Sequence, residues 1–148
     1  MRLARSLHRL GEPIVGCYLL EEAGEVTVID AGVPAYYCAL AAELEVLGCT
    51  SEDIRALVLT HGPDAHLGFS ARLRVERDVP VSIHELDAAR ARGEAGGPSA
   101  GMGERKLGSV LRYLLGLARR GYFRTKRLTR VSTFDPGATL DVPGALGV

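Results

Sequence analysis

Two histidines and an aspartate lie close together between residues 60 and 68. They are His61, Asp64 and His66. Neutral imidazoles and carboxylates are ligands for zinc, which they bind at about 2 Å. A buried strand before this segment and a helix after it would fix the backbone, so that these side chains could turn toward one point. The residue types therefore predict a metal site, with His61, His66 and Asp64 as candidate ligands.

A purely structural interpretation stays open for each of these residues. His61 and His66 could be polar loop residues at the start of a helix, and Asp64 fits the N-cap of that helix because its carboxylate can accept backbone N–H groups. A further histidine, His84, fits either an exposed residue at a strand end or a substrate contact. No residue of the segment is assigned a catalytic role, and Asp64 is the one candidate for such a role.

The elements needed to position these residues alternate along the chain. Short apolar runs rich in β-forming residues predict strands, and apolar residues at helical spacing predict helices. The expected strands are 14–20, 25–30, 54–59 and 80–83, and the expected helices are 34–47, 66–76 and 84–92. Residues 50–53 fit either a helix N-terminus or a capped turn, and residues 133–143 fit two short strands around a Pro-Gly turn. The alternation predicts an α/β sandwich.

The predicted strand 25–30 ends in an acid, Asp30, followed by the small pair Ala31-Gly32. Side chains at strand ends face clefts, where binding residues gather. Asp30 is therefore a candidate site residue, with an ordinary acid at a strand end as the alternative.

The region from residue 93 to residue 130 combines a glycine-rich loop with a basic helix. Residues 93–103 fit a flexible loop, and apolar residues recur at helical spacing between 107 and 118. Nine basic residues lie between Arg105 and Arg130. A solvated basic helix face explains them without a partner, and a nucleic-acid or membrane surface is the alternative.

Length and composition suit one ordinary globular domain. The chain has 148 residues, and eighteen basic residues balance eighteen acidic ones, so we expect neither a nucleic-acid nor a membrane partner. No apolar run is long enough to cross a bilayer, and no signal peptide is evident. We expect a cytoplasmic protein whose three cysteines, Cys17, Cys38 and Cys49, are reduced and buried.

The order of these motifs resembles the metallo-β-lactamase-fold hydrolases. Their metal loop, Thr-His-x-His-x-Asp-His-x-Gly, follows a buried strand, and this chain has Thr60, His61, His66 and Gly68 in register. Upstream and downstream of the loop, further segments resemble the family's flanking strands and its later hairpin. They are 26–32, 47–48, 53–59, 81–85 and 137–144.

Two positions depart from the family's loop. The family's second histidine falls on Pro63, and its aspartate falls on Ala65, with Asp64 one position early. Neither proline nor alanine carries a side-chain ligand, so the motif is degenerate. By resemblance, His61 and His66 remain metal ligands, Asp64 is a substitute ligand, and Asp30 orients the loop from behind.

The resemblance implies a partial αββα sandwich, about the first half to two-thirds of the family's domain. We expect residues 1–148 to form a single, C-terminally truncated domain in which residues 93–130 are a loop and a basic helical insertion. The resemblance also offers a lid over the active site as an alternative role for that insertion. It implies one or two zinc ions and hydrolysis of a small-molecule ester, thioester or amide by a metal-activated water. With this incomplete site, we expect weak or no hydrolysis. The alternative is a non-catalytic remnant or binding module of the same fold that self-associates, forming a homo-oligomer.

Overall fold

The computed structural model describes residues 3–4, 6–11, 15–60, 64–94, 115–116, 118–119, 121, 126–128 and 130–144, with the backbone alone at residues 64 and 65. Within these residues a six-stranded sheet forms, and its spatial order follows the chain. The strands are β1 (Leu7–Arg9), β2 (Tyr18–Glu22), β3 (Glu25–Ile29), β4 (Ile54–Leu59), β5 (Val81–His84) and β6 (Ser132–Phe134). Pairing is antiparallel from β1 to β3 and parallel from β3 to β6.

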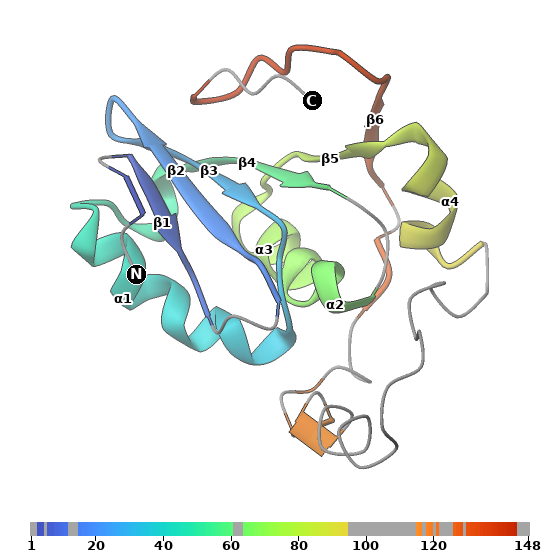
Figure 1. The fold of residues 1–148 in the computed structure, drawn as a ribbon, viewed down its shortest axis with the longest axis horizontal. Helices are drawn as coiled ribbons and strands as arrows, with labels where there is room; N and C mark the ends of the chain where they lie inside the picture. The colour runs from blue at the N-terminus through green and yellow to red at the C-terminus, as the bar shows by residue number, and fades with distance from the viewer. Residues whose placement is uncertain are drawn as a thin grey trace.

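Helices connect the parallel strands, as a parallel sheet requires. They are α1 (Tyr37–Val46), α2 (Asp64–Leu67), α3 (Ser70–Arg77) and α4 (Glu85–Arg92), with 3₁₀ turns η1 (Pro34–Tyr36) and η2 (Ser51–Asp53). Figure 1 shows α1, α2 and α3 together on one side of the sheet. This arrangement confirms the predicted α/β class.

Local sequence signals explain where α1 ends and where β4 begins. Gly48 follows α1 with φ 76° and donates its N–H to Glu45, a backbone conformation that glycine adopts without strain. Thr50 and Asp53 then form a reciprocal capping box around η2, which leads directly into β4. The predicted capped turn at residues 50–53 is confirmed.

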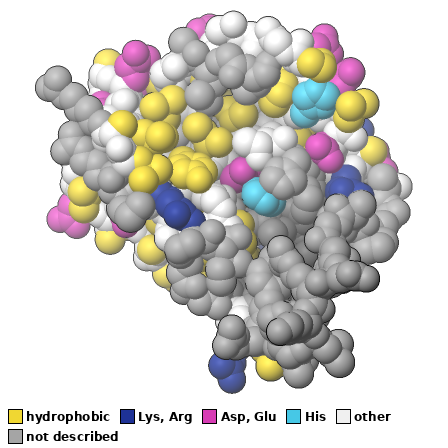
Figure 2. Space-filling view, viewed as in Figure 1, with side chains coloured by type: hydrophobic (Ala, Val, Ile, Leu, Met, Phe, Trp, Pro, Cys, Tyr) yellow, Lys and Arg dark blue, Asp and Glu magenta, His cyan; other side chains and the backbone are white. Residues whose placement is uncertain are grey.

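Alternation along the strands separates a buried face from a partly exposed one. Val26, Val28 and Leu57 point into the core with Leu40 and Leu44 of α1. On the opposite face burial is mixed. Tyr18, Leu20 and Ile29 are partly buried there, whereas Thr27 and Val58 are buried. Figure 2 shows hydrophobic side chains gathered over the strands on the face in view. Within the part of the chain that the structure describes, α1, α2 and α3 form a helical layer packed against one face of the sheet.

The C-terminal stretch crosses part of this second face. Thr27, a fully buried residue of β3, donates its hydroxyl to the Pro143 carbonyl oxygen at 2.8 Å. A side chain on Gly144 would collide with Leu20, because an added Cβ would lie 2.2 Å from its Cδ2. Residues 143 and 144 are thus packed directly on the sheet.

Three predicted elements are corrected by the structure. The helix expected at 66–76 is two helices, α2 and α3, because the chain breaks at Gly68-Phe69 to pack against the end of β3. The first strand of the expected hairpin begins at Tyr18 and runs to Glu22, so the turn is shorter. In the 133–143 region only β6 is a strand, and Thr139 forms an isolated bridge.

The insertion expected at residues 93–130 falls mostly outside the described residues. The helical residues described within it are 115, 116, 118 and 119. Among the described helices, none is long and apolar enough to span a membrane.

The expectation of three buried cysteines is wrong for Cys38. Cys17 and Cys49 are buried, whereas Cys38 is exposed on α1, where its side chain turns away from the core. Burial raises the pKa of the Cys17 thiol, and the Asp30 carboxylate raises it further. Burial also raises the pKa of Cys49, followed by the charges of Asp53 and Glu21.

These differences predict selective thiol labelling. Only the thiolate is nucleophilic, and a raised pKa lowers its population at pH 8. We expect iodoacetamide to modify Cys38 rapidly in the folded chain and to modify Cys17 and Cys49 only after denaturation. Peptide mass spectrometry of labelled samples measures this. Rapid labelling of Cys17 under native conditions would contradict its burial in the core.

Candidate metal centre

The buried carboxylate of Asp30 is the focus of the candidate centre. Asp30 follows β3 directly, with its side chain 6% exposed. Its backbone has φ 60°, the left-handed region, which aspartate tolerates better than most residues. Its N–H donates to the Val58 carbonyl oxygen at 2.8 Å, which continues the β3–β4 pairing by one residue. The turn out of β3 thereby aims the carboxylate across the end of β4.

Thr60, immediately after β4, is held by that carboxylate twice. Its backbone N–H donates to Asp30 Oδ1 at 2.9 Å, and its hydroxyl donates to Oδ2 at 2.7 Å. Sequence reasoning placed Thr60 in the loop motif but missed this contact. The sequence could have indicated this contact. Asp30 follows the end of β3 and Thr60 follows the end of β4, and these parallel strands are neighbours in the sheet.

His66, in α2, makes the third contact with Asp30. Its Nδ1 lies 2.9 Å from Asp30 Oδ2, and its side chain is 18% exposed. A carboxylate commonly holds one ring nitrogen of a metal-binding histidine, which fixes the orientation of the ring. The contact between Asp30 and His66 has that form. Two residues that the sequence singled out separately are therefore brought together.

The backbone of residues 31 and 32 locks α2 in place. Ala31 donates its N–H to the His66 carbonyl oxygen at 2.8 Å and accepts from Phe69 N–H at 3.2 Å. Gly68 packs so closely that an added Cβ would lie 2.2 Å from the Gly32 carbonyl oxygen and 2.4 Å from that of Ala31. Only a residue without a side chain fits there, which explains glycine at this position of the motif.

Cys17 supports the same turn from the core side. Its thiol donates to the Asp30 carbonyl oxygen at 3.1 Å. Because its raised pKa keeps the thiol protonated, it can act as this donor. Sequence reasoning treated Cys17 as an apolar filler and gave no sign of this role.

The remaining candidate residues are placed as follows. His61 and Pro63 lie outside the described residues, and Asp64 is the first residue of α2, with its side chain likewise outside them. The expected N-cap position of Asp64 is thus shifted by one residue into the helix. His84 is half-buried rather than exposed, and it caps α4 by accepting Leu86 N–H at Nδ1, 3.2 Å away.

The described residues do not by themselves fit a complete metal site. Among them, no three His, Cys, Asp or Glu side chains are grouped as they would be around a metal ion. His66 is the ligand candidate that the structure positions, and the replacements Pro63 and Ala65 bring no donor atom. What the geometry of the described residues provides is a rigid support built around Asp30, Thr60 and His66.

Substitution of Asp30 should loosen this support. In Asp30→Ala, the Thr60 donors lose their acceptor and alanine must adopt a positive φ, so we expect a loss of about 3 kcal/mol in the free energy of unfolding. Asp30→Asn keeps one acceptor and a residue that tolerates this φ, so we expect a loss of about 1–2 kcal/mol. Urea denaturation followed by circular dichroism measures both. Equal stability of the alanine variant and the unmodified chain would exclude a supporting role for Asp30.

Comparison with known proteins places this geometry in a family. The model of the metallo-beta-lactamase superfamily matches residues 10–144. YobT from Bacillus subtilis (strain 168) is 39% identical over 81 residues, which are 54% of this chain and 34% of YobT. A probable metallo-hydrolase of the same organism, YflN, is 28% identical over 100 residues, 66% of this chain and 38% of YflN.

Solved structures show the same fold. The class B3 di-zinc metallo-beta-lactamase LRA-12, from an Alaskan soil metagenome, superposes with a TM-score of 0.70 at 18% identity, covering 96% of this chain and 47% of the enzyme. A metallo-beta-lactamase family protein from Thermus thermophilus gives 0.65 at 25% identity, covering 97% and 50%. The chain thus spans about half the length of these structures and about a third of the curated relatives. With its sequence matched from residue 10 to residue 144 and its fold shared with solved members, the chain belongs to the metallo-beta-lactamase superfamily.

Proposed function

We propose that this chain carries an incomplete metal-dependent hydrolase centre in which His66 and His61 are metal ligands and Asp64 is a substitute third ligand. The observation that carries the proposal is the 2.9 Å contact between His66 Nδ1 and the Asp30 carboxylate. Such a contact fixes an imidazole for coordination and is expected where a ring must be presented to a metal.

Zinc is the metal we propose, since imidazole and carboxylate donors suit it and one structural neighbour is named as a di-zinc enzyme. When bound, zinc would supply a Lewis acid and an activated water for hydrolysis of an ester, thioester or amide. The residues of this chain would hold the imidazole and fix the loop around it. With proline at position 63 and alanine at position 65, we propose weak zinc binding and weak or no hydrolysis by this chain alone.

Zinc titration tests the proposal without depending on activity. We expect substoichiometric zinc after gel filtration, and His66→Asn should abolish what remains. The double substitution Pro63→His with Ala65→Asp should raise the zinc affinity by at least about tenfold, because it adds two donors. Isothermal titration calorimetry on metal-stripped protein measures these affinities, and a chromogenic ester monitors turnover.

His84→Asn is the matched control, because it removes an imidazole outside the loop and keeps a residue able to cap α4. It should leave zinc binding unchanged. Stoichiometric zinc with robust ester hydrolysis by the unmodified chain would overturn the incomplete site, and zinc binding unaffected by His66→Asn would overturn the ligand assignment.

A second candidate function, a non-catalytic module that self-associates, is supported by the outer face of the sheet. Tyr18, Leu20 and Ile29 are only partly buried there, and hydrophobic side chains gather over the strands in Figure 2. A second copy packed on this face would remove its apolar area from water.

Light scattering coupled to gel filtration measures this self-association. We expect a dimer at micromolar concentration, and Tyr18→Asp together with Ile29→Asp should shift it to monomer by placing charges on the face. Val46→Asp is the control, since Val46 is already 69% exposed on α1. A monomer at all concentrations would exclude this candidate.

A further inference from the structure

The charges of the chain are strongly segregated. Residues 105–130 contain nine of the eighteen basic residues and none of the acidic ones. The structure places a described part of this stretch, Lys126, Arg127, Leu128 and Arg130, along a groove that also borders α3. The groove has a volume of about 990 Å³, which is in the range of small-molecule sites.

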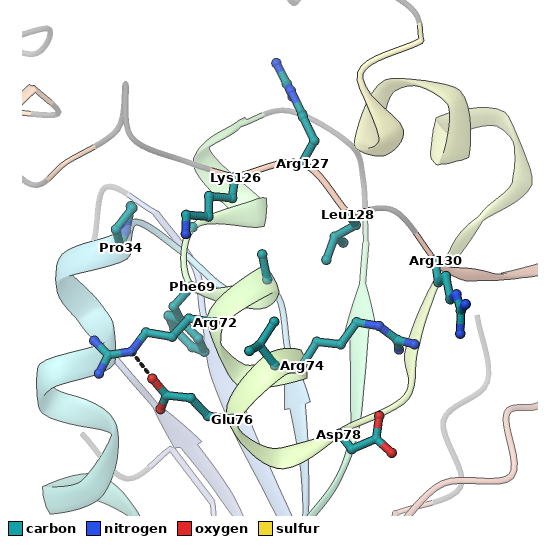
Figure 3. Close-up of a pocket in the computed structure, with 13 residues that line it drawn as sticks. Pro34, Phe69, Arg72, Arg74, Glu76, Asp78, Lys126, Arg127, Leu128 and Arg130 are labelled. Atoms are coloured by element: carbon teal, nitrogen blue, oxygen red, sulfur yellow. Dashed lines mark hydrogen bonds and ion pairs between the residues drawn. The ribbon is translucent and has the colours of Figure 1, made fainter.

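Two of the basic residues that line the groove are already engaged. Arg72 donates to Glu76 at 2.7 Å and stacks over the Tyr37 ring at 4.0 Å. Hydrogen bonds from Tyr37 and then from Arg72 lower the pKa of Glu76, so this carboxylate stays charged and committed to them. Figure 3 shows Arg127 extending away from the groove, and its stem packs close to Gly93.

Three cations remain along the groove: Arg74, Lys126 and Arg130. Figure 3 shows Lys126 at the end near Pro34, whereas Arg74 and Arg130 extend toward the opposite end, where Asp78 lies. Arg74 donates to the Val79 carbonyl oxygen at 3.4 Å, a long hydrogen bond that leaves most guanidinium donors for other partners. One acid therefore faces two guanidinium groups at this end.

The middle of the groove is apolar. Val75 is 85% exposed on α3, and Ala71 and the buried Leu128 lie along the same lining. An apolar stretch flanked by cations matches a ligand that has both an anionic and an apolar part.

We propose that this groove binds a phosphorylated organic molecule of nucleotide size. Its phosphates would lie between Arg74 and Arg130, since guanidinium groups bind phosphate through paired hydrogen bonds. Its apolar part would lie on Val75 and Ala71, and Lys126 would contact the far end. The site is separate from the candidate metal centre and uses none of its ligands.

Calorimetry with the full chain in EDTA tests the proposal, with ATP and inorganic tripolyphosphate as probes. EDTA removes any metal, so the outcome is independent of the proposed zinc centre. ATP should bind saturably and more tightly than tripolyphosphate. Arg74→Gln and Arg130→Gln should each weaken ATP binding about tenfold, because each removes a charged hydrogen-bond donor. Arg77→Gln, a substitution on the same helix of a residue paired with Glu52 outside the groove, should change it less than twofold.

Two further variants have expected results that a loss of folding could not produce. Asp78→Asn should tighten ATP binding severalfold by removing a repelling charge, and asparagine tolerates the left-handed conformation of this residue, φ 51°. Val75→Ser should weaken ATP binding but leave tripolyphosphate unaffected. Circular dichroism confirms that the variants are folded.

The proposal is overturned if ATP and tripolyphosphate bind equally, if Arg77→Gln weakens binding as much as Arg74→Gln, or if Asp78→Asn fails to tighten it. It is also overturned if the chain binds RNA or vesicles of anionic phospholipid but shows no saturable binding of ATP.

Discussion

The buried carboxylate of Asp30 is the interaction on which the candidate centre depends. A carboxylate out of contact with water is costly unless donors surround it. Two hydrogen bonds from Thr60 meet this requirement, and the His66 ring lies 2.9 Å from the same carboxylate. Meeting it ties the end of β3 to the end of β4 and to α2, which come from separate parts of the chain. The loop between β4 and α2 thus has both of its ends fixed by one side chain.

Close backbone packing adds a second constraint that is independent of charge. Gly68 lies against the carbonyl oxygens of Ala31 and Gly32, and this contact interrupts what would otherwise be one helix. The break changes the direction of the chain, so α3 begins beside the sheet end rather than continuing from α2. Gly68 thus lies beside the candidate centre and also borders the groove that is lined by Arg74, Lys126 and Arg130.

Much of this architecture could be predicted from the sequence because it depends on local patterns. The buried run at residues 54–59, the capping box at 50–53 and the strand-end acid Asp30 all lie where their residue types indicated. The break at Gly68 was missed because its cause is a contact with Gly32, 36 positions away in the chain. Strand β1 was missed for a similar reason. Its three residues are too few to show an alternating hydrophobic pattern, and its pairing with β2 defines it as a strand.

Both kinds of constraint act on residues that flank positions 61–63. Asp30, Thr60 and Gly68 contact one another and the backbone, and none of these contacts requires a metal ion. Their presence therefore supports the fold and does not discriminate between a working hydrolase and a non-catalytic descendant. Pro63 and Ala65 do discriminate, because a donor at either position would serve coordination rather than the support built around Asp30. Whether this chain can bind a metal must therefore be judged from positions such as 63 and 65, which the support around Asp30 does not require.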